Sequence, residues 1–273
     1  MSFLFRPIGR KKRVGWKPRV AFWGVFLAVL VAGYYWQPIR FEFFPPEVPV
    51  QSRVQPDEVG LLRSGARVLL VMGHPDDSEF YLGGTLLQMA RAGAVVRLVA
   101  MTDGDKAYYP CCVEPGLTER RRKEQRYAAS LWKGDVVFLG FKDGRLPVND
   151  ETVALLVEQF ESFDPDVIVS IDPVYRSRQS HSDHIDAGRN TLLAIEEWNK
   201  PVTVGLCNTR APNCFIEIER DWFGKTDLIA AHESQFFGDR LDLITGFLAD
   251  RALREGKKAG LGMAESLRVY RRE

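Results

Sequence analysis

The sequence predicts an α/β protein built on a doubly wound, mostly parallel sheet in three layers. Short apolar runs alternate with amphipathic helical patterns from residue 66 to residue 273. Such alternation is typical of sheets that helices cover on both faces. Polar side chains also gather directly after the apolar runs, at the edge where open α/β sheets bind their ligands. These two observations predict both the fold class and the position of a functional site.

Six apolar runs have the length and composition of buried strands. They cover Val68–Met72, Val95–Met101, Asp135–Phe141, Asp166–Ile171, Val202–Cys207 and Phe215–Ile218. The first run stops at Gly73 and places His74, Asp76 and Asp77 in the loop that follows. An imidazole and two carboxylates are costly to bury without a partner, and a divalent metal ion would be such a partner.

Helical patterns fill the intervals between the runs. Thr118 is a suitable N-cap residue, and Asp164-Pro165 is a helix stop. Two connections are expected to be loops, namely residues 105–117, over the site, and residues 172–180, which lead to His181. The expected helices cover residues 83–92, 118–132, 151–163, 184–198 and the C-terminal end, residues 231–235 included.

The composition is that of an ordinary globular protein. Of the 273 residues, 45% are hydrophobic and 27% are charged, and the formal net charge is +1. This length is ample for one sizeable core, and the charge balance argues against a nucleic-acid partner. The four cysteines are too few for a disulfide scaffold, and Cys207 and Cys214 could pair across a short loop if the domain is exported.

The N-terminal part of the chain differs from the rest. The run at 20–36 carries no charge and ends in aromatic residues suited to the lipid–water interface. Seven Lys and Arg residues precede it, which predicts a cytoplasmic N-terminus and a domain on the other side of the membrane. The alternative is a cleaved signal peptide with a small-residue site at 31–33. The predicted segments are a basic cytoplasmic segment at 1–19, a transmembrane signal anchor at 20–36, a Pro-rich linker at 37–65 and the folded domain at 66–273.

Three of the four histidines lie in two short motifs that follow predicted strands. His74 and Asp77 are three residues apart, as are His181 and His184. Imidazole and carboxylate ligands suit zinc, and catalytic zinc commonly keeps three protein ligands and an open position. A single histidine at a strand end is more often structural, but two motifs at one sheet edge favour a metal site. Gly83-Gly84 lacks the pattern Gly-x-Gly-x-x-Gly, which argues against a nucleotide-binding loop.

The chain contains His74-Pro75-Asp76-Asp77 with Gly83-Gly84, Thr102-Asp103-Gly104, Arg121-x-x-Glu124 and His181-x-Asp183-His184, and a weaker motif at His232-x-Ser234-Gln235. Taken together, these motifs resemble those of the LmbE-like (PIG-L) N-acetylglucosaminyl deacetylase family. The chain departs from the family's pattern where Ser78 precedes Glu79 after the two aspartates, and where Ser182 stands in place of the usual proline. Neither position is an expected metal ligand. The resemblance implies a Rossmann-like three-layer fold. It runs from about Arg67 to at least Asn190, in the family's order.

The resemblance also implies roles for the site residues. His74, Asp77 and His184 match the ligands of Zn²⁺, with another divalent metal such as Fe²⁺ as the alternative. Asp76 matches the general base that takes a proton from metal-bound water, and His181 is placed to stabilise the oxyanion.

Three further positions are expected to contact the substrate, namely Arg121, Asp143 and Asp103. The alternatives are a solvated helix face for Arg121, a turn for Asp143 and a loop cap for Asp103. Glu79 receives no role, and His232 is expected to pack in the interior.

The expected function is that of a membrane-anchored, zinc-dependent N-deacetylase of an N-acetylglucosamine-type amino sugar, carried on a glycan, a glycolipid or a lipid-linked sugar. One alternative is a zinc amidohydrolase of another N-acyl conjugate. Another is a non-catalytic sugar-binding module on the same fold, which would not need Asp76. Eukaryotic members of the family act at the cytoplasmic face, whereas the charge rule favours the opposite side, which we adopt. The oligomeric state is not predicted.

Overall fold

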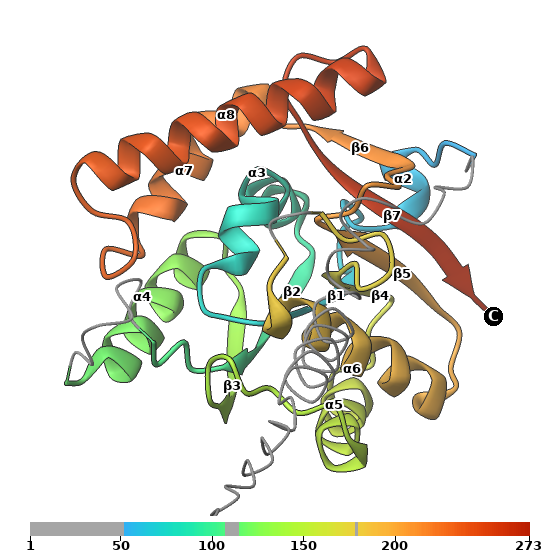
Figure 1. Cartoon of the computed structure of the whole chain (residues 1–273). Coiled ribbons are helices and arrows are strands. Elements are labelled where there is room, and N and C mark those ends of the chain that lie inside the picture. The colour runs from blue at the N-terminus through green and yellow to red at the C-terminus, as the bar shows by residue number, and fades with distance from the viewer. Residues whose placement is uncertain (1–51, 107–114, 178–179) are drawn as a thin grey trace, which may run out of the picture. The chain divides into compact units, whose positions relative to one another are not determined.

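Seven strands form one mixed sheet in the computed structural model, which describes residues 52–106, 115–177 and 180–273 (Figure 1). Their order is β3-β2-β1-β4-β5-β7-β6. The first five strands in this order are parallel, whereas β7 runs antiparallel to both β5 and β6. The strands are β1 Arg67–Met72, β2 Val95–Thr102, β3 Asp135–Phe141, β4 Val167–Ile171, β5 Val202–Cys207, β6 Cys214–Glu217 and β7 Ala264–Arg272. The predicted α/β fold with a mostly parallel sheet is confirmed, and all six predicted strands are present.

Helices cover both faces of the sheet (Figure 1). One face carries α3 Asp77–Ala92, α4 Leu117–Leu131, α7 Trp222–Ala230 and α8 Asp239–Ala259, together with the short α2 Pro56–Val59. The other face carries α5 Asp150–Phe163 and α6 Ser182–Trp198. A hydrophobic core lies on each face of the sheet, and strand β1 contributes side chains to both. Val68 and Leu70 pack in the core of the first face, and Leu69 and Val71 pack in the core of the second. A strand buried on both faces is apolar throughout, which made it easy to predict.

Helix α3 begins at Asp77 rather than at residue 83, and it bends at Leu82, where φ is −134°. Gly84 follows the bend, and a Cβ at this position would lie 2.6 Å from Cγ2 of Ile218. The glycine pair therefore permits close packing inside the helix and does not mark its start.

The expected helical C-terminal end is wrong in two places. Residues 231–235 lie in the connection between α7 and α8, and Ala264–Arg272 forms β7 rather than a helix. The strand contains no continuous apolar run, and the charged Glu265 is one of its buried residues, so its pattern did not stand out.

One charged residue of β7 ties this strand to the bend in α3. Glu265 accepts hydrogen bonds from the backbone N–H groups of Gly84 and Thr85, at 3.1 and 2.8 Å, and from the Thr85 hydroxyl at 2.6 Å. Lys225 of α7 lies 2.6 Å from the same carboxylate, and both side chains are buried. The pair stabilises the helix that carries Asp77 against the last strand of the sheet.

Residues 52–65, assigned to the end of the linker, pack against the domain. Leu61 is fully buried, and the backbone N–H of Val54 donates to the Asn213 carbonyl at 2.9 Å. Pro56 lies in the first turn of α2, where proline is tolerated, so the prolines here are compatible with packed structure.

The predicted basic segment, transmembrane anchor and most of the linker lie outside the described residues. Among the helices that the structure does describe, none is long and apolar enough to cross a membrane. Cys207 and Cys214 are both buried free thiols, so the pairing left open by the sequence is not formed.

Candidate metal and catalytic centre

The site lies at the carboxyl edge of β1 and β4, where the winding of the sheet reverses. From β1 the chain adds β2 and β3 on one side, and then returns to place β4 and β5 on the other. Such a switch point leaves a crevice beyond the strand ends, where α/β sheets bind ligands. His74 follows β1, and His181 and His184 lie at the start of α6, which follows β4.

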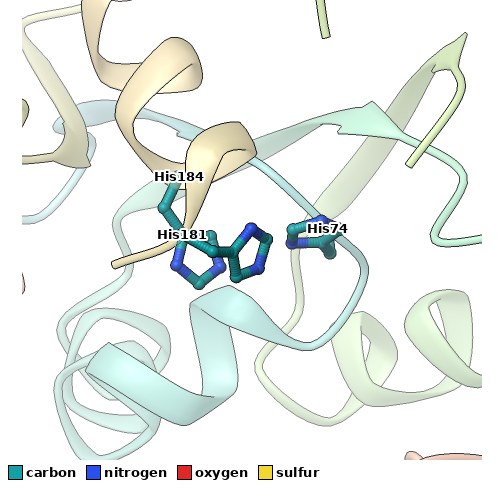
Figure 2. A group of neighbouring side chains, drawn as sticks. All are labelled: His74, His181 and His184. Carbon is teal, nitrogen blue, oxygen red and sulfur yellow. The ribbon is translucent and has the colours of Figure 1, made fainter. Parts of the chain in front are cut away.

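Three imidazoles from these two motifs face one another (Figure 2). The ring centroids of His181 and His184 are 4.0 Å apart, and that of His74 lies 4.7 Å and 5.2 Å from them, respectively. Ligand nitrogens of all three lie within 4.8 Å of one another. His74 and His184 are buried, and His181 is exposed. The structure thus brings together the two histidine motifs predicted from the sequence.

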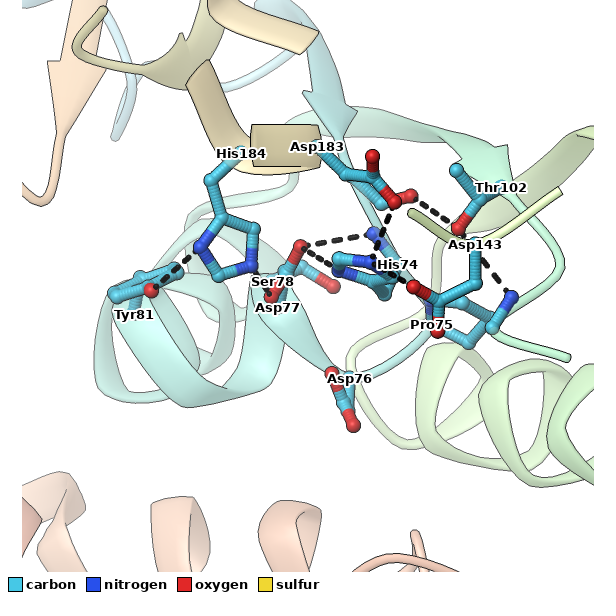
Figure 3. A network of polar contacts seen from close by, with 12 residues as sticks. His74, Pro75, Asp76, Asp77, Ser78, Tyr81, Thr102, Asp143, Asp183 and His184 are labelled. Carbon is cyan, nitrogen blue, oxygen red and sulfur yellow. Dashed lines mark hydrogen bonds and ion pairs between the residues drawn. The ribbon is translucent and has the colours of Figure 1, made fainter. Parts of the chain in front are cut away.

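Asp77 lies between His74 and His184 (Figure 3). Its Oδ2 is 3.3 Å from Nδ1 of His74, and its Oδ1 is 3.0 Å from Nε2 of His184. Burial by itself raises the pKa of Asp77, but the two imidazoles outweigh burial and hold that pKa well below its usual range. Asp77 is therefore an ionised carboxylate in contact with both predicted histidine ligands.

The other nitrogen of His74 faces two more carboxylates (Figure 3). Its Nε2 lies 3.3 Å from Asp183 and 3.4 Å from Asp143. Burial lowers the pKa of His74, but Asp143, Asp183 and Asp77 together outweigh burial and raise it well above its usual value. Burial also opposes ionisation of Asp183, yet His74 and the backbone N–H of Gly144 lower the pKa of Asp183 to about 2. Carboxylates in this position orient a metal-binding imidazole.

Asp183 is a site residue that the sequence prediction missed. It lies in the second motif, between His181 and His184, but the sequence did not indicate that its carboxylate contacts His74. Asp143 was expected to contact substrate, and the structure places it against His74 at the edge of the cleft.

The donor set of this centre fits a divalent cation. Nε2 of His74 is buried and makes no hydrogen bond of good geometry with any described residue. Three carboxylates, those of Asp77, Asp143 and Asp183, contact this one imidazole, so negative charge exceeds positive charge there. Buried carboxylates are costly without a compensating cation, and nitrogen and oxygen donors of this kind suit zinc and related metals. Ligand atoms of His74, Asp143 and Asp183 also lie within 4.8 Å of one another, as a second grouping.

Asp76 has a left-handed backbone directly before α3, with φ of 103° and ψ of −25°. For a residue other than glycine this conformation costs about 1–3 kcal/mol, and such strain is concentrated at active sites. Arg121 stabilises the strained loop, because its Nη2 donates to Asp76 Oδ2 at 2.9 Å and to the Pro75 carbonyl at 2.6 Å. Arg121 is buried, so the alternative of a solvated helix face is wrong.

The pKa values of Asp76 and His181 shift in directions that suit proton transfer. Burial raises the pKa of Asp76 above its usual value, Arg121 opposes the rise and Asp77 reinforces it. A carboxylate with a raised pKa beside a cleft is suited to accept a proton. His181 keeps an exposed surface, but the protein around its ring desolvates it, and this burial together with the two neighbouring imidazoles lowers the pKa of His181 to about 4. His181 is therefore neutral near pH 7 and keeps one N–H to donate.

His184 has a further contact on the side away from Asp77. Its Nδ1 lies 3.5 Å from the hydroxyl of Tyr81, to which Asn208 Nδ2 donates at 3.3 Å. Arg251 of α8 donates to Asn208 Oδ1 at 3.0 Å and lies over the Tyr81 ring, 5.2 Å from its centroid. These three residues come from separate elements, so no local pattern in the sequence pointed to them.

The centre opens into a cleft of about 320 Å³. Asp103, which was expected to contact the substrate, does not line this cleft. Its carboxylate accepts a hydrogen bond from Arg122 at 2.7 Å, and its backbone N–H donates to the Phe141 carbonyl. Most of the loop predicted to cover the site, residues 107–114, lies outside the described residues. The lining consists of the predicted residues His74, Asp76, Asp77, Arg121, Asp143, His181 and His184, together with Phe80, Tyr81, Lys106, Gln235 and Phe236.

His232 packs in the interior, as expected. Its Nε2 lies 3.4 Å from Oε2 of Glu79, and both side chains are buried. Burial raises the pKa of Glu79, but His232, Ser78 and Trp132 outweigh burial and lower it.

The fold and its switch point define a doubly wound α/β domain with a histidine–carboxylate centre suited to a divalent metal. Residues 69–195 match a protein-family model described as PIG-L, GlcNAc-PI de-N-acetylase. This segment therefore matches a PIG-L (LmbE-like) domain, and the resemblance predicted from the motifs is confirmed. The matched segment includes both histidine motifs and Arg121.

Several proteins similar to this chain are deacetylases. A diacetylchitobiose deacetylase of Thermococcus kodakarensis is 29% identical over 220 residues, which are 74% of this chain and 82% of the relative. A 1D-myo-inositol 2-acetamido-2-deoxy-alpha-D-glucopyranoside deacetylase of Thermobifida fusca is 31% identical over 166 residues, which are 51% of this chain and 57% of the relative. The structure of N,N'-diacetylchitobiose deacetylase from Pyrococcus horikoshii, in complex with its inhibitor MPG, matches with a TM-score of 0.71 and 26% identity, covering 74% of this chain and 83% of that one. The predicted enzyme class, an amide hydrolase of the N-acetylglucosaminyl deacetylase type, is confirmed by these relatives.

Proposed function

We propose that this chain is a zinc-dependent N-deacetylase of an N-acetylglucosamine-type amino sugar. The observation that carries the proposal is the position of Asp76, a carboxylate with a raised pKa that lines the same cleft as Asp77 and the histidines. The deacetylases that resemble this chain over three quarters of its length support the choice of substrate class.

In this proposal His74, Asp77 and His184 hold the metal. The chemistry supplied by a bound Zn²⁺ is Lewis acidity, for the attacking water and for the amide carbonyl. Nε2 of His74 lies 3.3 Å from Asp183 and 3.4 Å from Asp143, which favours a proton on Nε2 and leaves Nδ1, on the side of Asp77, to bind the metal.

The protein's own residues move the proton and stabilise the developing charge. Asp76 takes a proton from the attacking water and later returns it to the amine nitrogen, so the C–N bond breaks to give acetate and a free amino sugar. Arg121 favours the ionised form of Asp76, because it opposes the rise in the pKa, and it directs the carboxylate. His181 donates its N–H to the carbonyl oxygen, which gains negative charge as the carbon is attacked.

The cleft has the mixed character that a sugar ring requires. Phe80 and Phe236 provide apolar surface, whereas Lys106, Gln235 and Asp143 provide hydrogen-bonding groups. A volume of about 320 Å³ is at the lower end of the range for small-molecule sites. We propose that Asp143 contacts a substrate hydroxyl in addition to His74.

The test is release of acetate by the purified protein from a panel of N-acetylglucosamine conjugates, including diacetylchitobiose and a glycolipid. Activity should disappear with a chelator and return with Zn²⁺. The Asp76→Asn variant should retain the metal and lose about 10²- to 10⁴-fold in kcat. Asp103→Asn is the matched control, since Asp103 lies outside the cleft and should leave acetate release within about twofold.

Several results would contradict the proposal. Turnover of other N-acyl conjugates without turnover of amino sugars would favour the general amidohydrolase. Sugar binding without turnover would favour a binding module, and activity in metal-free protein would exclude the role given to His74, Asp77 and His184.

We propose further that residues 20–36 anchor the domain in a membrane, with the N-terminus in the cytoplasm. The support is the uncharged apolar run and the seven basic residues that precede it. In spheroplasts, external protease should degrade the domain of the full chain. Protection of the domain would place it on the cytoplasmic side, and recovery of the full chain in the soluble fraction would contradict anchoring.

A further inference from the structure

Glu79 is a buried carboxylate that no step of the proposed reaction uses. It is fully buried in the first turn of α3, directly after the position where the first motif departs from the family's pattern. Three groups donate hydrogen bonds to it, and Nε2 of His232 lies 3.4 Å from its Oε2. Ser78 Oγ donates to Oε2 at 2.7 Å, and Gln125 Nε2 and Trp132 Nε1 both donate to Oε1 at 2.8 Å.

Gln125 connects this carboxylate to Asp76. Its Nε2 donates to Glu79, and its Oε1 accepts the backbone N–H of Asp76 at 2.8 Å. Gln125 is fully buried and lies one helical turn after Arg121 on α4. Two residues on one face of α4 therefore hold Asp76, Arg121 by the carboxylate and Gln125 by the backbone.

The orientation of the Gln125 amide is determined at both ends. The indole N–H of Trp132 can only donate, so Oε1 of Glu79 is an acceptor, and the group of Gln125 that meets it must be the NH₂. The backbone N–H of Asp76 can also only donate, so it requires the amide oxygen. A flipped amide would set two acceptors against each other at Glu79 and two donors against each other at Asp76.

We propose that Glu79 is a positioning residue for Asp76. By fixing the Gln125 amide, it holds the left-handed backbone that directs the Asp76 carboxylate into the cleft. The role of Glu79 in turnover rests on the proposed function of Asp76 as the base. The effect of Glu79 on the backbone of Asp76 does not depend on that function.

The first readout is hydrogen exchange at the Asp76 amide, which requires no substrate. Exchange should be slow in the wild type and in Glu79→Gln, because a glutamine keeps an oxygen for Gln125 and Trp132. It should be faster by about tenfold or more in Glu79→Leu and in Gln125→Met, in which the hydrogen bond is loosened or lost. Trp132→Phe is the matched control. It removes another donor from the same carboxylate and leaves the contact with Gln125, so the Asp76 amide should stay protected.

The second readout is steady-state kinetics. Glu79→Leu should lower kcat by about 10- to 100-fold with KM changed much less, because the base is misplaced while the cleft is intact. Since Glu79 acts through Gln125, Glu79→Leu should add little in the Gln125→Met background. Glu79→Gln should restore most of the rate.

Three results would overturn the inference. These are an unchanged Asp76 amide in Glu79→Leu, equal acceleration of exchange in Trp132→Phe, and multiplicative kinetic losses in the double variant. If Glu79→Leu does not fold, Glu79→Asp retains the buried charge but withdraws the acceptor from Gln125, and the same exchange measurement applies. A wild-type protein without deacetylase activity would contradict the proposed function and would leave the exchange result to decide the positioning role.

Discussion

The guanidinium of Arg121 lies 2.9 Å from the carboxylate of Asp76, and their side chains are only 5% and 14% exposed. Arg121 also donates to the Gly104 and Pro75 carbonyls, so it joins the loops that follow β1 and β2. A residue that was expected to contact substrate is thus also the charged partner of the proposed base.

Arg121→Lys should impair turnover although it preserves the charge. A lysine cannot bridge Asp76, Pro75 and Gly104 together, and loss of charge-assisted hydrogen bonds of about 1.5–3 kcal/mol corresponds to about 10- to 100-fold in kcat/KM.

In Arg121→Met the positive charge that opposes the rise is gone, so the pKa of Asp76 should rise further. Because the base works only when ionised, the acid limb of the pH–rate profile should move to higher pH.

The matched control is Arg120→Met, at the neighbouring position of α4. Arg120 is 44% exposed and pairs with Glu124, so its removal should leave the pH profile where it is. An acid limb that does not move in Arg121→Met would show that Arg121 does not act on Asp76.

Asp183→Asn should weaken metal binding. The carboxylate of Asp183 orients His74 through Nε2, and loss of such a partner typically costs 10- to 100-fold in metal affinity. The measurement is competition for Zn²⁺ with a chromophoric chelator, which needs no substrate. Asp186→Asn, one turn further along α6, removes a carboxylate that pairs with Arg189 and should leave the affinity unchanged. Equal affinities for wild type and Asp183→Asn would exclude the orienting role.

Arg268→Met should make the protein less stable in a pH-dependent way. Burial raises the pKa of Asp172, but hydrogen bonds from Arg268 and Thr209 outweigh burial and lower it below its usual value. A carboxylate with a lowered pKa stabilises the fold above its unfolded-state pKa, and that contribution is lost as the pH falls through the folded-state value. Removing one partner of this buried pair should cost about 3 kcal/mol at neutral pH and less in acid.

Urea unfolding at several pH values measures this difference. The control is Arg254→Met, which breaks an exposed ion pair with Asp250 and should change stability by less than about 1 kcal/mol. A stability difference between wild type and Arg268→Met that stays constant down to acid pH would contradict the assignment.

Lys225→Met should destabilise the fold more than most substitutions, because it leaves Glu265 buried without its cationic partner. The expected loss is about 3–5 kcal/mol in the free energy of unfolding. The double variant Lys225→Met with Glu265→Gln should recover part of this loss, since the neutral amide is cheaper to bury than an unpaired carboxylate. No recovery would mean that packing, rather than the unpaired charge, dominates the cost.

The sequence was most informative where ligand types and strand ends coincide. His74, Asp77 and His184 could be grouped because each follows an apolar run, and parallel strands end at one edge. By contrast, Arg121 contacts Asp76 across 45 residues, through the packing of α4 against the loop after β1, and no local pattern encodes that contact.

The errors have similar causes. Gly83-Gly84 resembled a helix start, whereas the pair allows Ile218 and Lys225 to pack closely against α3. The strand at Ala264–Arg272 was missed because it contains no continuous apolar run and the charged Glu265 stands at one of its buried positions, although its neighbours β5 and β6 were predicted.

The hydrogen bonds of Glu265 also affect the order in which a functional protein is made. Thr85, in the helix that carries Asp77, meets its partner on β7 only 180 residues later in the chain. During synthesis the histidine of the first motif and both its aspartates leave the ribosome long before the strand that secures their helix. A nascent chain halted before β7 therefore has every residue of the centre but lacks the carboxylate that holds α3, so such products should bind metal less tightly than the full chain.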